Sequence, residues 1–177
     1  MSKLDLNFER DPFADLTEAA GFAPEVSVVM PVYNAAQTVA ASVASVLAQS
    51  FGYFELIAID DGSHDDSLSL LIDLAARDPR IKVVGRENGG VSSARNLGVE
   101  MAQAPIIAFL DADDLWEPEK LAYHVALHRD DPALAASYAR IAFIDGEATS
   151  VAGARTLSSL CPHSPRLVDV LGENPVC

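Results

Sequence analysis

The sequence predicts an α/β protein built on a mostly parallel, doubly wound sheet with helices on both faces. Short, nearly continuous apolar runs, typical of strands buried on both faces of a parallel sheet, alternate with longer segments that carry apolar residues at helical spacing. Turns such as Asp61-Gly62-Ser63 stop these runs. This repeated strand–helix alternation favours parallel strands joined by crossover helices.

The expected elements follow the chain in order. Strands are expected at Val26–Val32, Phe54–Asp60, residues 81–84, residues 106–110 and residues 135–144. Helical faces are predicted by Val39, Val43, Val46 and Leu47, by Leu68, Leu71, Ile72 and Ala75, by Ala94, Leu97, Gly98 and Met101, and over residues 117–128. Ser63 and Asp66 resemble a capping box for the second helix. Right-handed crossovers predict the strand order 3-2-1-4.

Composition narrows the function. The chain has 177 residues and a formal net charge of −14. Nucleic acids and anionic membrane surfaces bind basic footprints, so nucleic acid is not an expected partner, and a phosphorylated ligand would need a cation as mediator. No apolar run approaches the ~20 residues that span a bilayer, and the N-terminus lacks the order of a signal peptide. We expect a cytoplasmic protein, free or at the inner face of the membrane.

Domain organisation follows from the same patterns. Residues 1–24 are acidic and lack clear periodicity, so they are expected to form a flexible N-terminal extension. Residues 25–177 are expected to form one domain, since this length suffices for one α/β core but is short for two.

An acidic cluster follows the apolar run at residues 106–110. Asp111, Asp113 and Asp114 lie within four residues of one another and would repel each other without a nearby positive charge. Asp114 is well explained as a cap for the helix that follows, but capping needs only one carboxylate. Mg²⁺ or Mn²⁺ is commonly held by one or two carboxylates together with the phosphates of a ligand. The cluster therefore favours metal-assisted phosphate chemistry.

Three polar loops should converge near this cluster. The predicted order reverses between the first and fourth strands, and open α/β sheets bind ligands at the carboxyl ends beside such a reversal. Tyr33 offers an aromatic face for a base, and Asp61 offers an acceptor for its N–H edge. Gly89 lets the backbone approach a ligand, and Arg95 can reach a phosphate or neutralise the acidic rim.

Four motifs together resemble a known family. VSVVMPVYNAAQTVAASVASVLAQSF, ELIAIDDGSHDDS, ENGGVSSARNLGVEMA and IIAFLDADDLWEPEKL are similar, in order and spacing, to the nucleotide-binding half of family 2 glycosyltransferases, which adopt the GT-A fold. The likeness covers residues 25–128 closely and continues weakly to residue 177. A lone Asp-x-Asp motif would be a weak signal, but four motifs in register are highly specific.

The resemblance implies a role for each matching position. Pro31 and Tyr33 are expected to flank the base, with Tyr33 stacked on uracil and Asp61 accepting from the base edge. Asp113 is expected on the metal, with Asp111 near the ribose or the metal. The implied donor-binding residues are Pro31, Val32, Tyr33, Asn34, Asp61, Gly89, Arg95, Asp111 and Ala112, and the implied metal ligands are Asp113 and Asp111. The metal, Mg²⁺ or Mn²⁺, would bridge the phosphates of a nucleotide sugar, most simply a UDP-sugar.

The resemblance also implies parts that this chain does not display. Family members transfer the sugar with inversion, using a carboxylate base well downstream of the Asp-x-Asp motif. No matching Glu-Asp pair stands between Ser137 and Cys177. We therefore expect the base beyond Cys177, and a truncated, inactive domain that still binds the donor. The saccharide or lipid-linked acceptor would bind the missing part, and the truncated face could support a homodimer.

Two other readings remain open. A phosphatase of the haloacid dehalogenase type would use Asp111 as nucleophile and Asp113 as acid. Against it, Leu115 stands where a hydroxyl is needed, and the loop follows the fourth strand instead of the first. The other reading is a non-catalytic nucleotide-sugar-binding module, which becomes the better hypothesis if the natural protein ends at Cys177.

Overall fold

The structure, a computed structural model, describes residues 23–139. The chain divides into two compact units between Glu119 and Lys120. The first unit contains a four-stranded sheet and three helices, and the described part of the second contains one helix. The expected N-terminal extension lies almost wholly outside the described residues, as does the chain from residue 140 onward.

The sheet is parallel throughout its four strands. These are β1 (Val26–Val32), β2 (Phe54–Asp60), β3 (Ile81–Gly85) and β4 (Ile106–Phe109), in the order β3-β2-β1-β4. Val26 of β1 lies opposite Phe54 on one side and Ile106 on the other. The strand order and the α/β class predicted from the sequence are confirmed, with the order reversing between β1 and β4.

The two central strands are buried along their whole length. All seven residues of β1 and all seven of β2 are buried, and both strands have the predicted bounds. β4 differs, because it ends at Phe109 instead of residue 110 and is only half-buried, with Phe109 52% exposed. Among the described strands β4 pairs only with β1, so it is an edge strand with less cover than a central strand receives.

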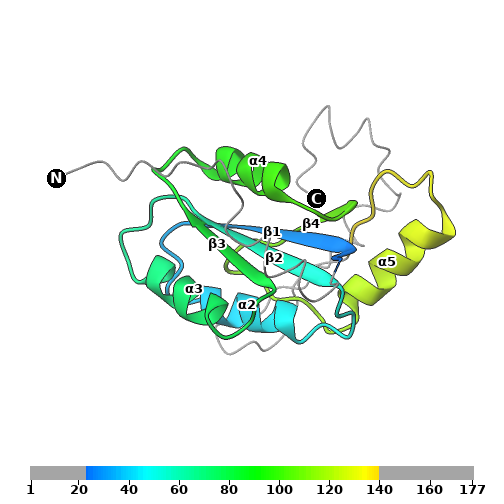
Figure 1. Ribbon diagram of the computed structural model, residues 1–177, viewed down its shortest axis with the longest axis horizontal. Helices are drawn as coiled ribbons and strands as arrows, with labels where there is room; N and C mark the ends of the chain where they lie inside the picture. The colour runs from blue at the N-terminus through cyan, green and yellow to red at the C-terminus, as the bar shows by residue number, and fades with distance from the viewer. Residues whose placement is uncertain (1–22, 140–177) are drawn as a thin grey trace, which may run out of the picture. The chain divides into compact units, whose positions relative to one another are not determined.

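Helices cover both faces of the sheet, as the sequence predicts (Figure 1). α4 (Val91–Met101) lies on one face, and α2 (Val39–Leu47) and α3 (Ser67–Ala75) lie on the other. α4 packs on a cluster formed by Ile57, Ile59, Val84 and Ala94. Gly98 allows the closest approach, because a Cβ there would lie 2.4 Å from Cγ1 of Val29.

The start of α3 differs from the prediction. The helix begins at Ser67, and Asp66 at its N-cap makes no side-chain capping bond. Ser63 does not form the predicted capping box, because its hydroxyl accepts a hydrogen bond from the Asn34 N–H at 2.9 Å. Ile72, which was expected in the core, is 55% exposed. The helical face is therefore narrower than its apolar residues suggest.

α5 (Lys120–Asp130) belongs to the second unit and starts three residues later than predicted. The Pro118 carbonyl, which would accept within a longer helix, instead accepts from the Ser50 N–H at 2.9 Å. The predicted strand at residues 135–144 is wrong for residues 135–139, which form no strand, and its remainder lies outside the described residues. Ala133, Ala135 and Ala136 explain part of this error, because alanine is depleted in strands.

A buried ionic network lies at the amino ends of the strands. Nζ of Lys82 lies 3.1 Å from Oε2 of Glu55, and both side chains are 3% exposed. Oε1 of Glu55 also accepts from the Ser27 hydroxyl at 2.5 Å and from the Gln103 N–H at 2.8 Å. The network thus joins three adjacent strands to the segment between α4 and β4.

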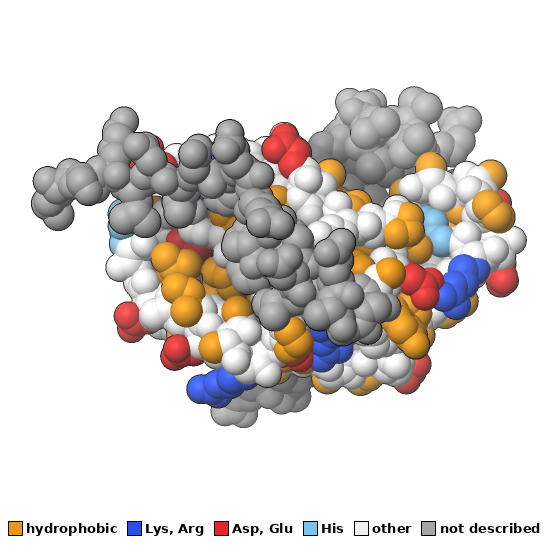
Figure 2. All heavy atoms as spheres, in the orientation of Figure 1, with side chains coloured by type: hydrophobic (Ala, Val, Ile, Leu, Met, Phe, Trp, Pro, Cys, Tyr) orange, Lys and Arg blue, Asp and Glu red, His pale blue; other side chains and the backbone are white. Residues whose placement is uncertain are grey.

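The acidic composition is visible on the surface of the protein. Acidic side chains are scattered over the face drawn in Figure 2 and do not gather in one patch. Within residues 23–139, no helix combines the length and apolar character that crossing a bilayer requires.

Candidate functional site

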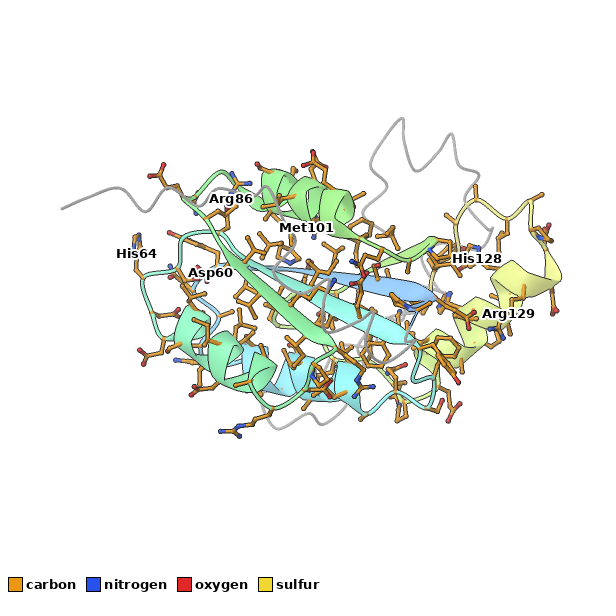
Figure 3. The ribbon with its side chains drawn as sticks, viewed as in Figure 1. Asp60, His64, Arg86, Met101, His128 and Arg129 are labelled. Atoms are coloured by element: carbon orange, nitrogen blue, oxygen red, sulfur yellow. The ribbon has the colours of Figure 1, made fainter. Side chains whose placement is uncertain are left out.

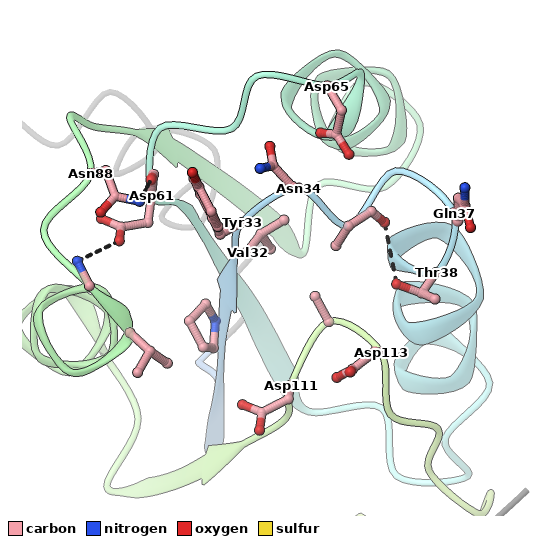
Figure 4. A pocket seen from close by; sticks show the side chains of 15 residues that line it. Val32, Tyr33, Asn34, Gln37, Thr38, Asp61, Asp65, Asn88, Asp111 and Asp113 are labelled. Carbon is pink, nitrogen blue, oxygen red and sulfur yellow. Dashed lines mark hydrogen bonds between the residues drawn. The ribbon is translucent and has the colours of Figure 1, made fainter.

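A pocket of about 590 Å³ lies in the first unit, where loops leave the carboxyl ends of the strands (Figure 4). It is lined by Pro31, Val32, Tyr33, Asn34, Ala35, Gln37, Thr38, Asp61, Asp65, Asn88, Gly90, Val91, Asp111, Ala112 and Asp113. Pro31 and Val32 end β1 and Val91 begins α4, and the other lining residues come from the segments that follow the four strands. Both the acidic loop and the aromatic loop predicted from the sequence therefore face one cavity.

Most of the predicted site residues line this pocket. They are Pro31, Val32, Tyr33, Asn34, Asp61, Asp111, Ala112 and Asp113. Gly89 and Arg95 are not among the lining residues, but each touches one: the Gly89 N–H donates to Asp61, and the Arg95 side chain donates to Asp111. Thr38 and Asp65 are among the lining residues that the sequence analysis missed. Thr38 could have been found, because it stands just before a predicted helical face, whereas no signal pointed to Asp65.

The loops after β1 and β2 bind each other directly. The Asn34 N–H donates to the Ser63 hydroxyl at 2.9 Å, and Oδ1 of Asn34 accepts from the His64 N–H at 2.8 Å. Asn34 has a φ of +50°, a left-handed conformation that asparagine tolerates better than most residues. Tyr33 is half exposed, and its ring meets the His64 ring edge-on with centroids 6.4 Å apart. The reciprocal bonds of Asn34 therefore fix the loop that presents Tyr33.

Asp65 and Ser67 anchor the next part of the same loop. The Ala35 N–H donates to the Ser67 hydroxyl at 2.8 Å, and the Ala36 N–H donates to Oδ2 of Asp65 at 3.0 Å. The Ser67 hydroxyl donates to Oδ1 of Asp65 at 2.5 Å. The hydrogen bond from Ser67, and then that from Ala36, lower the pKa of Asp65 below its usual value. Asp65 thus remains an acceptor that ties the first loop to α3.

Asp61 holds the loop that follows β3. Its Oδ1 accepts from the Gly89 N–H at 3.0 Å, and its Oδ2 accepts from the Gly90 N–H at 2.7 Å, the contact region shown in Figure 4. Arg86 adds an ion pair, with Nε 3.1 Å from Oδ1. Asp61 is only 3% exposed. The carboxylate that was expected to meet a base is therefore fixed by groups on the neighbouring loop.

The two acids of the Asp-x-Asp motif have different surroundings. Nη2 of Arg95 lies 2.6 Å from Oδ1 of Asp111 in a part-exposed ion pair. Asp113 is exposed, and within the described part of the chain no cationic side chain pairs with it. No group of three or more His, Cys, Asp or Glu side chains among residues 23–139 is arranged to hold a metal by itself. A metal ion bound here would therefore need further oxygen ligands from a bound molecule, in addition to these carboxylates.

Polar side chains on α2 and just after it hydrogen-bond to the backbone of the acidic loop and of the residues that follow it. Ser42, which is fully buried, donates its hydroxyl to the Ala112 carbonyl at 2.9 Å. The Ser45 hydroxyl accepts from the Trp116 N–H at 3.1 Å, and Nε2 of Gln49 donates to the Glu117 carbonyl at 2.8 Å. Ser42 and Ser45 are three residues apart and share one side of α2, and Gln49 follows just after the C-terminal end of the helix. The backbone of the acidic loop is therefore held without using its carboxylates.

Solved structures share this fold. The chain is similar to S. aureus TarS 1-349 in complex with UDP-GlcNAc, with 29% identity and a TM-score of 0.55 over 60% of this chain and 31% of that one. It is also similar to the mannosyltransferase PcManGT from Pyrobaculum calidifontis in complex with GDP-Man and Mn²⁺, with 27% identity and a TM-score of 0.58 over 62% and 34% of the two chains.

Sequence relatives agree with the structural neighbours. An uncharacterized glycosyltransferase of Rickettsia felis is 43% identical over 97 residues, which is 55% of this chain and 16% of that protein. The Escherichia coli UDP-Glc:alpha-D-GlcNAc-diphosphoundecaprenol beta-1,3-glucosyltransferase WfgD is 39% identical over 103 residues, or 58% of this chain and 40% of the relative. The match therefore spans less than half the length of either relative.

The parallel sheet, its loop-lined pocket and these structural neighbours define a GT-A glycosyltransferase fold. The model of the family described as Glycosyl transferase family 2 matches residues 27–171. The chain belongs to this family.

Proposed function

We propose that this pocket binds a nucleotide sugar, most simply a UDP-sugar, and a divalent cation for transfer of a hexose to an acceptor hydroxyl. The observation that carries the proposal is one cavity lined by the aromatic ring of Tyr33, the fixed carboxylate of Asp61 and the carboxylate of Asp113, which no cationic side chain within residues 23–139 pairs with. TarS 1-349 was solved in complex with UDP-GlcNAc and PcManGT in complex with GDP-Man, which supports a nucleotide-sugar ligand.

The base and the diphosphate have separate places in this proposal. Tyr33 stacks on the base with the half-exposed face of its ring, and Asp61 accepts from the N–H edge of the base. Pro31 flanks the base together with Tyr33, and Val32 and Asn34 line the same wall of the pocket. The acidic loop then lies beside the diphosphate, with Ala112 between its two carboxylates.

The available ligands suit Mg²⁺ or Mn²⁺, because these ions do not need a site made of protein ligands alone. Such ions are usually bound through one or two carboxylates together with substrate phosphates, and that is the set that Asp113, Asp111 and a diphosphate provide. Asp113 would be the principal ligand, because Asp111 already pairs with Arg95. When bound, the cation supplies Lewis-acid stabilisation of the departing diphosphate.

The acceptor of the sugar is a hydroxyl group on a saccharide or lipid-linked saccharide. Transfer with inversion requires a carboxylate that takes the proton from the acceptor hydroxyl, and none of the pocket acids is assigned that role. The name of WfgD describes a saccharide on diphosphoundecaprenol, which supports a lipid-linked saccharide as the acceptor class. We accordingly place the reaction in the cytoplasm, at the inner face of the membrane.

Calorimetry with UDP, with and without Mn²⁺, tests the proposal. The wild-type chain should bind UDP in a metal-dependent manner, and Asp113→Asn should abolish that dependence while circular dichroism stays unchanged. Asp114→Asn is the matched control, because Asp114 is an adjacent acid that does not line the pocket. Equal UDP affinity of wild type and Asp113→Asn in Mn²⁺ would refute the metal site. Absence of UDP binding together with hydrolysis of p-nitrophenyl phosphate would favour the phosphatase reading.

A further inference from the structure

Arg86 lies just outside the pocket wall, directly after β3. Figure 3 shows it at the same end of the sheet as Asp60, near α4. The Arg86 N–H donates to the Asp60 carbonyl at 2.9 Å. Its side chain pairs with Asp61 through Nε at 3.1 Å and donates from Nη1 to the Ser93 hydroxyl at 2.8 Å. One guanidinium therefore joins the end of β2 to the first turns of α4.

The loop between β3 and α4 closes around the Asp61 carboxylate. Nδ2 of Asn88 donates to the Asp61 carbonyl at 2.9 Å, while the Gly89 and Gly90 N–H groups bind the carboxylate itself. The Gly89 N–H takes one acceptor position on Oδ1 and the Gly90 N–H takes one on Oδ2, whereas the Arg86 Nε–H donates to the Glu87 carbonyl at 3.1 Å and meets Oδ1 as an ion pair. A carboxylate offers about four acceptor positions, so each oxygen keeps one for a further donor. Asp61 lines the pocket, and because Arg86 lies beside Oδ1, the second position on Oδ2 is the one that we assign to a ligand.

Gly89 makes room for the guanidinium in its observed position. A Cβ at this residue would lie 2.1 Å from Nη2 of Arg86, so any other residue would displace the end of the arginine side chain. Gly90 has a φ of +87°, which also favours glycine. The two glycines therefore let the loop lie flat against Arg86 while their N–H groups point at Asp61.

We propose that Arg86 is a positioning residue that aims Asp61 at the base, so that the pocket takes bases with a ring N–H and rejects cytosine. This inference rests on the proposed function. A buried carboxylate needs compensation of its charge, and removing one partner of such a pair is costly. Arg86 supplies that compensation and also holds the loop whose N–H groups fix the carboxylate.

The selectivity follows from the chemistry of the two pyrimidines. A carboxylate held as an acceptor receives a hydrogen bond from N3–H of uracil. The N3 of cytosine instead carries a lone pair, which repels the carboxylate at the same place. Hydrogen bonds to charged groups contribute enough to separate the two ligands by roughly 10- to 100-fold. UDP should therefore bind more tightly than CDP by that factor.

The test measures Kd for UDP, CDP and inorganic pyrophosphate, all in Mn²⁺, on wild type, Arg86→Ala and Arg86→Lys. Arg77→Ala is the matched control, an exposed arginine beyond the C-terminal end of α3. Arg86→Ala should weaken UDP by about tenfold or more and reduce the UDP/CDP ratio, since the aim of Asp61 is lost. Pyrophosphate carries no base, so its Kd should stay within about twofold. Arg86→Lys should restore part of the ratio because it keeps the charge.

The outcomes separate the inference from the proposed function. Metal-dependent UDP binding by wild type, with an unchanged UDP/CDP ratio in Arg86→Ala, would overturn the role of Arg86 alone. A parallel loss of UDP and pyrophosphate binding would also overturn it, since it indicates general unfolding of the pocket. No UDP binding by wild type would refute the proposed function itself. If Arg86→Ala does not fold, Ser93→Ala, which removes only the Nη1 contact, should lower the ratio to a smaller extent, and an unchanged ratio there would overturn the inference.

Discussion

Nη2 of Arg95 lies 2.6 Å from Oδ1 of Asp111, so one acid of the Asp-x-Asp motif is neutralised within the protein. The other acid, Asp113, faces the same pocket without a described cationic partner. The two carboxylates are therefore not equivalent, although the motif presents them symmetrically. Arg95 also explains how residues with like charges stay close together, because its side chain reaches the rim from α4.

The charge of Arg95 should weaken binding of a bare cation. In Arg95→Gln, Asp111 loses its partner, and the pocket becomes more negative around Asp113. We expect Mn²⁺ alone to bind a few-fold more tightly, because a unit charge at about 4 Å in water contributes on the order of 1 kcal/mol. Arg95→Lys keeps the charge and should resemble wild type. Titration of free Mn²⁺ by electron paramagnetic resonance measures this, and weaker binding in Arg95→Gln would contradict it.

Tyr33 should contribute to nucleotide affinity but not to the core. Its ring is half exposed and lines the pocket. If it stacks on the base, Tyr33→Ala should weaken UDP binding by ~1–3 kcal/mol, while Tyr33→Phe should keep most of the affinity. Both variants should unfold at the wild-type temperature. An unaltered Kd in Tyr33→Ala would show that the ring only packs against His64.

Gly98 should be required for the packing of α4 on β1. A methyl group there would lie 2.4 Å from Cγ1 of Val29, which is fully buried. Overpacking costs about 1–3 kcal/mol, while alanine gains about 1 kcal/mol in helix propensity, so Gly98→Ala should lower the free energy of unfolding by about 1 kcal/mol.

Chemical denaturation measures the effect of Gly98→Ala. Gly52→Ala is the control, since a Cβ at Gly52 would meet nothing within 4 Å. Adding Val29→Ala should make the Gly98→Ala change less costly, because it removes the clashing methyl group. Additive effects of the two substitutions would rule out this contact as the cause.

His124 should make stability depend on pH. Partial burial lowers the pKa of His124 below its usual value of 6.5, and the charges of Lys120 and His128 lower it further. The folded chain therefore binds fewer protons at this site than the unfolded chain does. Its contribution is complete above pH 6.5 and is lost as pH falls from 6.5 through the lower folded pKa.

His124→Gln should remove this part of the pH dependence. Nδ1 of His124 lies 2.7 Å from the Ser137 hydroxyl, and glutamine can still bond there. Amide hydrogen exchange of α5 between pH 7.5 and 5.5 should show a smaller loss of protection in the variant than in wild type. His64→Gln, on the exposed loop after β2, is the control. If protection of α5 changes equally with pH in wild type and His124→Gln, His124 is not the source of this pH dependence.

The central strands and the strand order could be predicted from the sequence, but the exposure of the edge strand β4 could not. β1 and β2 are buried on both faces, so their apolar runs coincide with the strands and polar residues mark their ends. β4 has the same kind of run, but its exposure depends on which strand lies beside it. The alanine-rich segment near residue 135 shows the complementary error, in which an apolar run was taken for a strand.

The site could be predicted as a set of loops, but not as a set of contacts. Asp61 and Asp113 stand at strand ends, where topology alone places them near the pocket. That Asp61 is held by Gly90 and Arg86 depends on contacts between residues about 25 to 29 positions apart. Ser42 gave no signal, because a serine on a helix is ordinary until the acidic loop lies against it.

The Glu55–Lys82 pair has a consequence for strand alignment. Side chains alternate between the two faces of a strand, so displacing β2 by one residue would turn Glu55 toward the layer of α2 and α3. Lys82 would then lose its ion pair with Glu55 in a buried environment, which carries a large free-energy penalty. The pair therefore disfavours a shifted alignment at the amino ends of the strands, and this fixes the spacing of the pocket-lining loops at their carboxyl ends.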